Sequence, residues 1–404
     1  MMCYEKLSSD RKLGASIGPI AVMTFPLGFV FSRPVLIVAD PELIKDMNIR
    51  DFHNFVDHND VKSGDPLNDR SLFNLMGDEW KDKYLELKVK NGDELDVKRA
   101  MGNLTMDVIA SCAFGTQIDV HNDNKTNEFV ANAQQITSII SKRRSQRNSG
   151  KHRDYLQLII NAQNRSADNS EDQDIDDLNE HIFGKTDALK YQKTANVVIT
   201  DDDMLATSFL FFVAGYETTA TLLSFLTYEL AINEKCQQKL YEEIKAFNGN
   251  YSYESIARMP YLEACIAETL RLYNPVSAVS RVAIDDYKLG NTGITIPKGM
   301  IINFDIESIH KSSDYHPNPF CWDPERFMPQ NRDQLVSGTY MPFGTGPRNC
   351  VGMRFALMEA KTAVAHLITK YRFKRTANTT VPLKYKKFEF LLTPGGIHIG
   401  IEKR

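Results

Sequence analysis

The most constraining feature of the sequence is an apolar stretch of helical length at residues 204–232, which reads MLATSFLFFVAGYETTATLLSFLTYELAI. Thr200 and the three aspartates that follow it are typical of a helix start, because a hydroxyl caps unpaired N–H groups and negative charge suits the positive end of the helix dipole. The next break falls near Asn233. Because a helix that is apolar on nearly all sides cannot lie on a surface, we expect one long helix through the centre of the protein.

The rest of the chain predicts a mainly α fold with small β-sheets. A second helix is expected at 262–272, short strands with tight turns at 282–301, and a last helix from Cys350 to about Tyr371. A terminal hairpin is expected at 389–402, around Pro394. Residues 142–199 contain a basic segment and then an acidic one, which indicates a polar, mobile linker, or alternatively a strip that meets anionic lipid or an acidic partner.

Residues 13–32 carry no charge and have the length of a membrane span. Glycines and prolines interrupt them, however. The apolar run PVLIV that follows is closed by Asp40 and Pro41, residue types that commonly end a short strand. A β-hairpin is therefore favoured over a spanning helix, with a lipid-contacting surface patch as a third alternative. The chain holds 48 basic and 52 acidic residues, a balance without bias toward polyanions, so nucleic acid is not an expected partner.

A glycine-rich segment before the last helix ends in a cysteine, and residues 343–352 read FGTGPRNCVG. Glycines permit backbone angles closed to other residues and let a large flat molecule approach the main chain. Cys350 then begins a helix, where backbone N–H groups and the helix dipole can hold its sulfur as a thiolate, which is an iron ligand. Arg348 is placed to meet an acidic group of the same cofactor. The alternative is a cysteine that only packs, whereas a dinucleotide loop would need a third glycine.

The middle of the long helix carries polar residues, AGYETT at 214–219, that burial alone does not explain. Buried acids and hydroxyls are costly unless they are used. Gly215 weakens the helix and Thr218 can bond back to a carbonyl one turn earlier, so together they permit a local widening that holds water or a small ligand. Beside an iron, such a groove would deliver protons to bound dioxygen. The alternative is a simple kink in which Glu217 makes an ordinary salt bridge.

Two further segments, ETLR at 268–271 and PERF at 324–327, contain an acid and two arginines. Glu268 and Arg271 are three residues apart and so share one helix face. Such a pair is usually a surface pair of little energetic value. Here the neighbours are apolar, so we expect a buried network of Glu268, Arg271 and Arg326 that locks the helix against the coil leading to Cys350.

These four segments, in this order, resemble the haem-thiolate monooxygenase family, cytochrome P-450. The similarity covers nearly everything from Thr200 to the C-terminus and, more loosely, residues 34–80. Details such as PRNCVGMRFA and TPGGI are similar to animal microsomal enzymes that oxidise drugs, steroids and plant toxins, arthropod members especially. The resemblance implies a single cytochrome P-450 domain over residues 1–404.

The resemblance also assigns roles to matching residues. It implies that haem b is held by the axial thiolate of Cys350, and that Thr218 and Glu217 handle dioxygen and protons while Ala214 faces the substrate. The other residues that it places around the haem are Phe343 as a shield for the sulfur, Gly344, Gly352 and Gly215 as close backbone neighbours, and Arg348, Arg281 and Trp80 as partners of the propionates. Glu268, Arg271 and Arg326 would form the structural triad.

The sequence departs from the family in three places. Tyr84 stands where the family commonly has an arginine, four residues after Trp80. The stretch between Trp80 and Asp107 is shorter than in relatives, so part of the helix at Trp80 and its sequel is expected to be missing. The stretch from Glu128 to Leu158 is too short for the pair of helices that roofs the substrate pocket, and a pocket without its roof admits water and uncouples turnover.

The implied reaction inserts one atom of dioxygen into an apolar substrate of the xenobiotic, steroid or fatty-acid type, while the other atom leaves as water. The sequence lacks hydride-carrier and flavin motifs, so the electrons come from another protein, by resemblance an NADPH-dependent flavoprotein reductase. Arg348 and Lys361 are candidate contacts for its docking. The resemblance also implies the cytoplasmic face of the endoplasmic reticulum, with peripheral membrane contact because no anchor helix is expected in this chain.

The main alternative is a truncated haem-binding protein without effective monooxygenase activity, because ligation needs only the C-terminal half whereas substrate control needs the missing helices. A zinc enzyme or a nicotinamide enzyme is a weaker alternative. The sequence contains neither a spaced set of zinc ligands nor a complete phosphate-binding loop.

Overall fold

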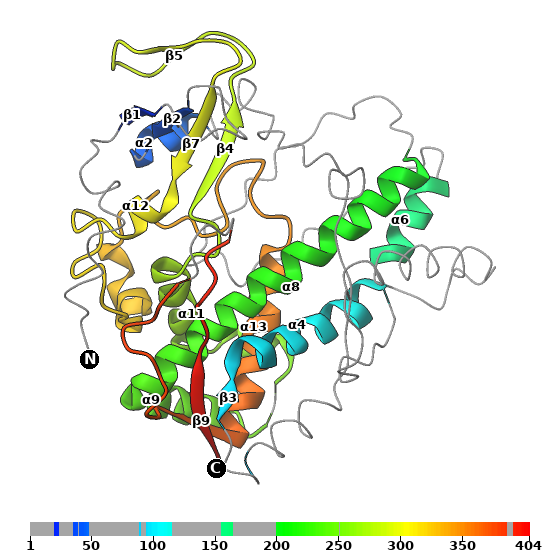
Figure 1. Cartoon of the computed structure of the whole chain (residues 1–404), viewed down its shortest axis with the longest axis vertical. Coiled ribbons are helices and arrows are strands. Elements are labelled where there is room, and N and C mark those ends of the chain that lie inside the picture. Colours follow the sequence, from blue (N-terminus) through cyan, green and yellow to red (C-terminus); the bar gives the residue numbers. More distant parts are fainter. Residues whose placement is uncertain are drawn as a thin grey trace.

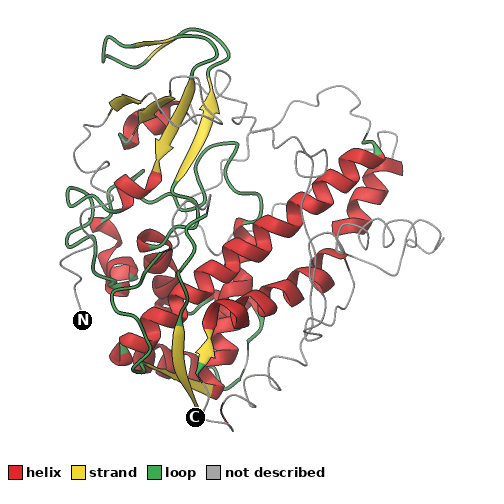
Figure 2. Cartoon of the chain, viewed as in Figure 1, coloured by secondary structure: helices red, strands yellow, loops and turns green. Residues whose placement is uncertain are grey.

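The protein is mainly helical with three small sheets, in a computed structural model that describes residues 20–23, 35–38, 40–47, 89, 94–114, 155–164, 199–249, 251–385 and 391–404 (Figures 1 and 2). The helices are α2 Pro41–Lys45, α4 Val97–Phe114, α6 Tyr155–Asn164, α8 Asp201–Ile232, α9 Glu234–Lys245, α10 Tyr253–Ala257, α11 Pro260–Leu272, α12 Ile306–His310 and α13 Met353–Lys370, with short 3₁₀ helices at Pro324–Phe327 and Pro329–Gln334. The strands are β1 Ile20–Met23, β2 Val35–Val38, β3 Leu95–Asp96, β4 Ala278–Val282, β5 Tyr287–Lys288, β6 Thr295–Ile296, β7 Ile301–Asp305, β8 Tyr371–Lys374 and β9 His398–Lys403. The predicted fold class is confirmed.

Helix α8 begins and ends where the sequence predicts. The Thr200 hydroxyl accepts a hydrogen bond from the Asp203 N–H at 3.1 Å, and the Asp203 carboxylate accepts one from the Thr200 N–H at 2.9 Å. This reciprocal cap satisfies two donors that a helix start leaves unpaired. The helix then crosses the molecule diagonally as its longest element (Figure 1).

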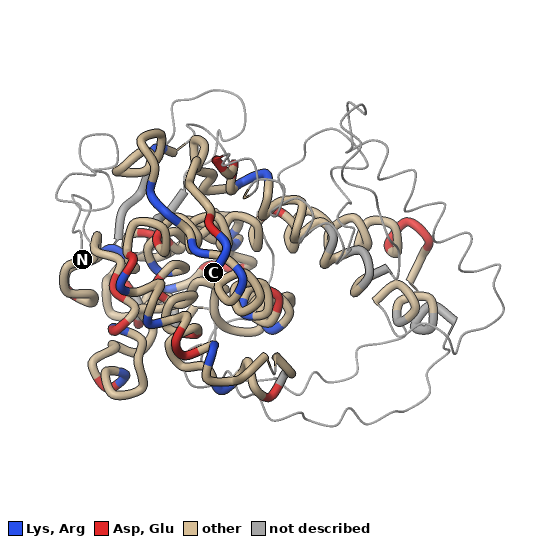
Figure 3. Tube along the Cα trace, turned by 90° about the horizontal axis from the view of Figure 1, so that it is seen from below, with Lys and Arg blue, Asp and Glu red and all other residues tan. Residues whose placement is uncertain are grey.

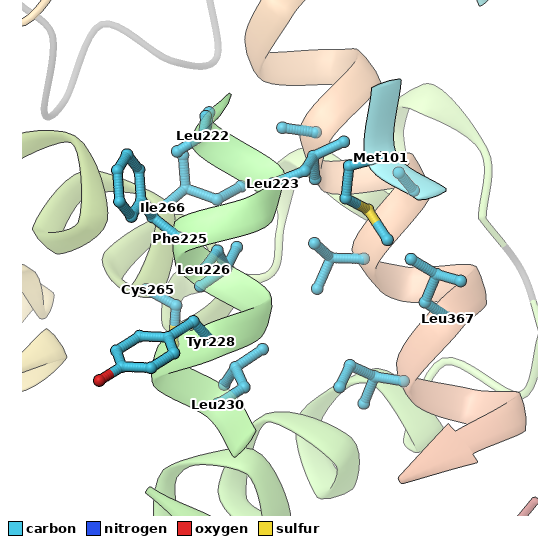
Figure 4. Packing of buried hydrophobic residues seen from close by; sticks show 14 of the residues in the cluster. Met101, Leu222, Leu223, Phe225, Leu226, Tyr228, Leu230, Cys265, Ile266 and Leu367 are labelled. Carbon is cyan, nitrogen blue, oxygen red and sulfur yellow. The ribbon is translucent and has the colours of Figure 1, made fainter. Parts of the chain in front are cut away.

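Burial of α8 on all sides, however, holds only for its C-terminal half. From Thr219 to Ala231 every residue is buried, in a core shared with α4, α9, α11 and α13. In Figure 4 the side chains of α8 lie between Cys265 and Ile266 of α11 on one side and Leu367 of α13 on the other. In the N-terminal half, Leu210 is 53% exposed and Ala214 is also exposed. Among the described elements, α4 and α6 contact this half, and they pack against its other faces.

Helix α8 is, among the described residues, the one helix long and apolar enough to cross a membrane. More than half of its most apolar window is nevertheless buried against other parts of the protein. Its apolar character is therefore accounted for by its place in the core.

The uncharged N-terminal stretch contains strand β1, which pairs antiparallel with β2. Strand β2 continues the sheet in parallel with β7, and β7 pairs antiparallel with β4, giving the order β1-β2-β7-β4. At the described residues this stretch is therefore part of a sheet, as the hairpin alternative expects. The short strands β4 to β7 likewise occupy the region where tight turns and alternation predict them.

The predicted terminal hairpin is only partly right. A turn does lie at Pro394–Gly396, where the Gly395 N–H donates to the Lys384 carbonyl at 2.7 Å. Strand β9, however, pairs with β8 and β3, in a three-stranded sheet of order β3-β9-β8. The described ladder partners of β9 thus lie outside the predicted hairpin, while the turn itself carries an isolated bridge between Tyr385 and Pro394.

Part of the predicted linker is a helix. Within 142–199 the structure describes α6, whose Leu156 and Ile160 pack with α4 and α8 in a second apolar cluster. Apart from residue 199, the remainder of that range lies outside the described residues. The same holds for Trp80, for Tyr84, and for residues 80–88, 90–93 and 128–154 of the two stretches predicted to be shortened, so these stay predictions.

Candidate functional site

The segment that precedes α13 is a tight hairpin whose turns depend on glycines. It runs from Phe343 to Cys350 and is called the cysteine hairpin below. The Cys350 N–H donates to the Phe343 carbonyl at 2.8 Å, and the Asn349 N–H donates to the Gly346 carbonyl at 3.0 Å. Gly344 and Gly346 have φ angles of +75° and +76°, a left-handed region that other residues rarely adopt. The hairpin therefore needs these glycines in order to present Cys350.

Cys350 is an exposed free thiol just before the first turn of α13. The Gly352 N–H donates to its sulfur, and a Cβ at Gly352 would lie 3.9 Å from that sulfur. Desolvation by the surrounding loop raises the pKa of the Cys350 thiol, although the Gly352 N–H opposes that shift. The Gly352 N–H thus acts in the predicted direction against desolvation, and a bound metal ion would favour the thiolate further.

Two arginines lie close enough for their charges to interact. Arg281, on β4, is only 2% exposed, and its Nη1 donates to the Ser280 carbonyl at 2.9 Å. Burial, and secondly the positive charge of Arg348, lower the pKa of Arg281 to about 10. Two guanidinium groups that repel each other form a site for an anion, since a negative group between them would remove the repulsion. Haem propionates have the chemistry that such a site binds.

The middle of α8 presents a hydroxyl on its open face. The Thr218 hydroxyl donates to the Ala214 carbonyl one turn earlier, as the sequence predicts. The helix nevertheless remains α-helical throughout, so the predicted widening is not formed. Leu210, Ala214 and Thr218 follow one another at intervals of four residues and so share one helix face. This face is apolar at Leu210 and Ala214 and polar at Thr218.

Glu217 points instead to α4. Its Oε1 lies 2.5 Å from Nζ of Lys98, and the same Nζ donates to the Thr221 hydroxyl at 3.0 Å. Each side chain of the ion pair is about one-fifth exposed, at 22% for Lys98 and 23% for Glu217. The structure thus corresponds to the salt-bridge alternative for Glu217 and places Thr218 in a separate contact.

The structure brings Glu268, Arg271 and Arg326 together. The fully buried Glu268 accepts from Arg271 through both oxygens, at 2.7 and 2.8 Å, and lies 3.4 Å from Arg326. The Asp323 N–H donates to Glu268 at 2.9 Å. These contacts join α11 to the 3₁₀ segment that contains PERF, so the charges are paired and hydrogen-bonded, as buried charges must be.

A histidine that sequence reasoning missed connects this network to the cysteine hairpin. His310 is fully buried; its carbonyl accepts from Arg271 at 2.7 Å, and its Nε2 accepts from the Met341 N–H at 3.0 Å. Burial, and then the charge of Arg271, hold the pKa of His310 well below its usual range, so the ring is neutral and can accept. Lys361, by contrast, is fully buried in an ion pair with Glu263 at 3.0 Å. It is therefore not a docking contact, and that prediction is wrong.

The fold and these groups together define a haem-thiolate protein: mainly helical, with an open cysteine on a glycine hairpin and a paired-arginine anion site. The described residues contain no cluster of three His, Cys, Asp or Glu side chains that could hold a metal ion, so the zinc alternative has no support there. The Cytochrome P450 family model matches residues 82–401. The chain belongs to the cytochrome P450 family.

Relatives from insects agree with this assignment. The chain is 28% identical to Cytochrome P450 6k1 and 32% identical to Cytochrome P450 9e2, both of Blattella germanica, over 93% of its length and 84% and 85% of theirs. It is 31% identical to Cytochrome P450 6a2 of Drosophila melanogaster, over 99% of the chain and 89% of that protein. These alignments extend over 453 to 464 positions, more than the 404 residues of the chain, so the relatives have internal segments that this chain lacks.

Membership of the family makes the chain a haem monooxygenase that binds haem b through a cysteine thiolate. The alternative of a haem-binding protein without activity is not favoured by these relatives. Arg281 with Arg348, and Cys350 with the Gly352 N–H, form a donor set that fits this cofactor.

Proposed function

We propose that the protein oxidises lipophilic organic molecules of the xenobiotic, steroid or fatty-acid type, with electrons from an NADPH-dependent flavoprotein reductase. The observation that carries the substrate class is the open face of α8, where Leu210 and Ala214 leave apolar surface uncovered by the described residues. Apolar surface of this kind binds apolar substrates by the hydrophobic effect. Thr218 supplies a hydroxyl one turn further along the same face.

In this proposal the chain's own residues hold the cofactor and move protons. Cys350 would hold the iron through its sulfur, and Arg281 and Arg348 would hold the propionates, while Phe343 of the same hairpin packs against the main apolar core. When bound, haem supplies the redox chemistry that activates dioxygen, helped by electron donation from the thiolate. Thr218 and Glu217 would move the protons, and each would have to exchange its partner to do so, because the Thr218 hydroxyl donates to the Ala214 carbonyl and the Glu217 carboxylate accepts from Lys98.

The reductase is proposed to dock beside the cysteine hairpin. Arg348 and Arg354 are exposed there, Val351 is 85% exposed and Phe355 is 37% exposed. An apolar centre with basic neighbours suits a partner with an acidic docking face. We also place the protein at the cytoplasmic face of the endoplasmic reticulum, in contact with the membrane, as for the family in general.

The proposed function is tested with purified holoprotein, NADPH-dependent reductase and a panel of lipophilic substrates under isotopically labelled dioxygen. We expect a product that carries one labelled oxygen atom and that requires both NADPH and reductase. Binding of the same substrates, followed by the haem spectrum, is measured in parallel. A thiolate-type carbon monoxide band with no product from any substrate would overturn the proposal in favour of an inactive haem-binding protein.

The paired arginines lead to a separate prediction about haem retention. Replacing Arg281 by leucine is expected to speed the loss of haem about 10- to 100-fold, because a hydrogen bond to a charged group contributes roughly 1.5–3 kcal/mol. The measurement is the rate of haem transfer from the holoprotein to an excess of a haem-scavenging protein. The matched control is Arg372→Leu, which removes an arginine whose side chain is 43% exposed and paired with Glu234. Equal rates for the two variants would contradict the assignment.

A further inference from the structure

One carboxyl group lies in the centre of the core without a counter-charge. Glu229, in the C-terminal half of α8, is completely buried. After its acidic start, α8 has two charged residues, Glu217 and Glu229, and the helix is drawn mostly tan there in Figure 3. The described side chains that contact the Glu229 carboxyl are neutral. Because a buried charge without a partner is costly, the state of this group needs an explanation.

Three helices meet at this carboxyl. The Tyr273 hydroxyl, at the end of α11, donates to Glu229 Oε1 at 2.5 Å. Asn233, between α8 and α9, donates through Nδ2 to Glu229 Oε2 at 2.9 Å and to the Glu229 carbonyl at 2.9 Å. The Tyr273 ring stacks on Phe225 of α8, with ring centroids 4.5 Å apart, and Tyr385 lies beside both rings. These contacts join α8 to α11 and to the start of α9, and we call them the Glu229 clasp.

The surroundings of Glu229 favour its neutral form. Burial is the largest cause that raises its pKa, to about 8, and the negative charge of Glu268 on α11 adds to the shift. The hydrogen bonds from Tyr273 and Asn233 act in the opposite direction but are outweighed. The only basic residue of α11, Arg271, donates twice to Glu268, at 2.7 and 2.8 Å, and so is already paired.

The remaining titratable groups near the clasp supply no positive charge. Tyr273 and, around it, Tyr228 and Tyr385 are phenols, which are neutral or negative but never positive. Burial, and secondly the Glu229 charge, hold the pKa of Tyr273 well above its usual range, so its hydroxyl remains a donor. On α9, Glu234 forms its ion pair with Arg372, at 2.9 Å.

We propose that Glu229 is a proton switch in the core, which carries a proton in the folded protein and loosens the junction of α8 with α11 when it loses that proton. A carboxylate there attracts water and repels Glu268. The junction matters for the cofactor because Arg271, two residues before Tyr273, holds the His310 carbonyl at 2.7 Å, and His310 in turn holds the base of the cysteine hairpin. The switch is independent of the proposed substrates and of the reductase.

Such a switch makes the stability of the fold depend on pH. In the unfolded chain the Glu229 carboxyl ionises at its ordinary pKa of 4.5, whereas in the folded chain it ionises at about 8. Between these two values unfolding releases a proton, so this group alone raises the unfolding equilibrium constant about tenfold per pH unit. The contribution of Glu229 to stability is therefore greatest below pH 4.5, is lost as the pH rises to about 8, and changes no further above that.

The first test is urea unfolding of the holoprotein and of E229Q at several pH values between about 5.5 and 7.5, inside this window. Glutamine keeps the size of the side chain and is neutral at every pH. The unfolding constant of the parent divided by that of E229Q is expected to rise about 30- to 100-fold over the range. The control is E234Q, because Glu234 is 62% exposed in its ion pair, and here the ratio should not change with pH. The same pH dependence in the parent and in E229Q would overturn the proposal.

A second, direct readout does not require that E229Q folds. Infrared spectroscopy separates protonated carboxyl groups from carboxylates, so the parent holoprotein should show a protonated carboxyl band that is lost above about pH 8. Y273F removes a donor that lowers the pKa of Glu229, so the same band should shift and persist to higher pH. If the parent lacks the band at neutral pH, or if Y273F leaves it unchanged, Glu229 is not the proton carrier.

Haem retention tests the consequence for the cofactor. The rate of haem transfer to an excess of a haem-scavenging protein is measured for the parent and E229Q below and above about pH 8. The rate of the parent should rise more steeply with pH than that of E229Q, because only the parent gains a buried charge at the junction of α8 with α11. Parallel rates in the two proteins would overturn the link between the Glu229 clasp and the cysteine hairpin.

Discussion

Replacing Cys350 by serine is expected to abolish the thiolate-type carbon monoxide band of the reduced holoprotein, together with all product formation. Cys350 is the free thiol that the glycine hairpin presents at the start of α13. A serine hydroxyl has nearly the same shape but is a hard oxygen donor that does not give electron density to iron as a thiolate does. The loss should therefore be complete, although the apoprotein still folds. The measurements are the difference spectrum and the labelled-oxygen assay.

The matched control is Cys112→Ser. Cys112 is also exposed but lies on α4, away from the hairpin. Its replacement should leave the spectrum and the product yield unchanged. A thiolate-type band that survives in C350S, or disappears in C112S, would show that the ligand has been assigned to the wrong cysteine.

The features that could be predicted from the sequence are those with a local signature. The apolar run and the capping residues predicted helix α8, and its two ends lie at the predicted positions. The network of Glu268 with Arg271 followed from a spacing of three residues on an apolar helix, and Arg326 was placed beside it by the second segment. In each case residues close in sequence determine the geometry.

The features that could not be predicted depend on contacts between distant parts of the chain. Lys98 and Glu217 are 119 residues apart, and no spacing rule links them. Lysine is a residue type that usually lies at the surface. Packing of α13 against α11 nevertheless buries Lys361 beside Glu263, 98 residues away. Strand β9 pairs with β8 and β3 rather than within the predicted hairpin at 389–402 for the same reason. The pKa of Cys350 likewise depends on desolvation by the folded loop, which the helix-start argument leaves out.

Replacing Glu268 by glutamine is expected to destabilise the protein by about 3–5 kcal/mol, because it leaves the buried Arg271 without a counter-charge. Glutamine keeps the size of the side chain, so the loss would come from charge and hydrogen bonding rather than from a cavity. Native domains are stable by only roughly 5–15 kcal/mol, so such a loss removes a large share of the margin. The measurement is the urea midpoint of the holoprotein, with the yield of soluble haem-loaded chain as a second readout.

The position of the network gives this substitution a second effect. Arg271 also donates to the His310 carbonyl, and His310 in turn accepts from the Met341 N–H at the start of the cysteine hairpin. When Arg271 loses Glu268, its orientation and that of His310 are no longer fixed, so haem should be retained less well even in molecules that remain folded. Asp285→Asn is the control, because its ion pair with Lys298 is about 70% exposed and contributes roughly 0–1 kcal/mol. If E268Q matched D285N in both midpoint and haem retention, the buried network would not be what holds the hairpin in place.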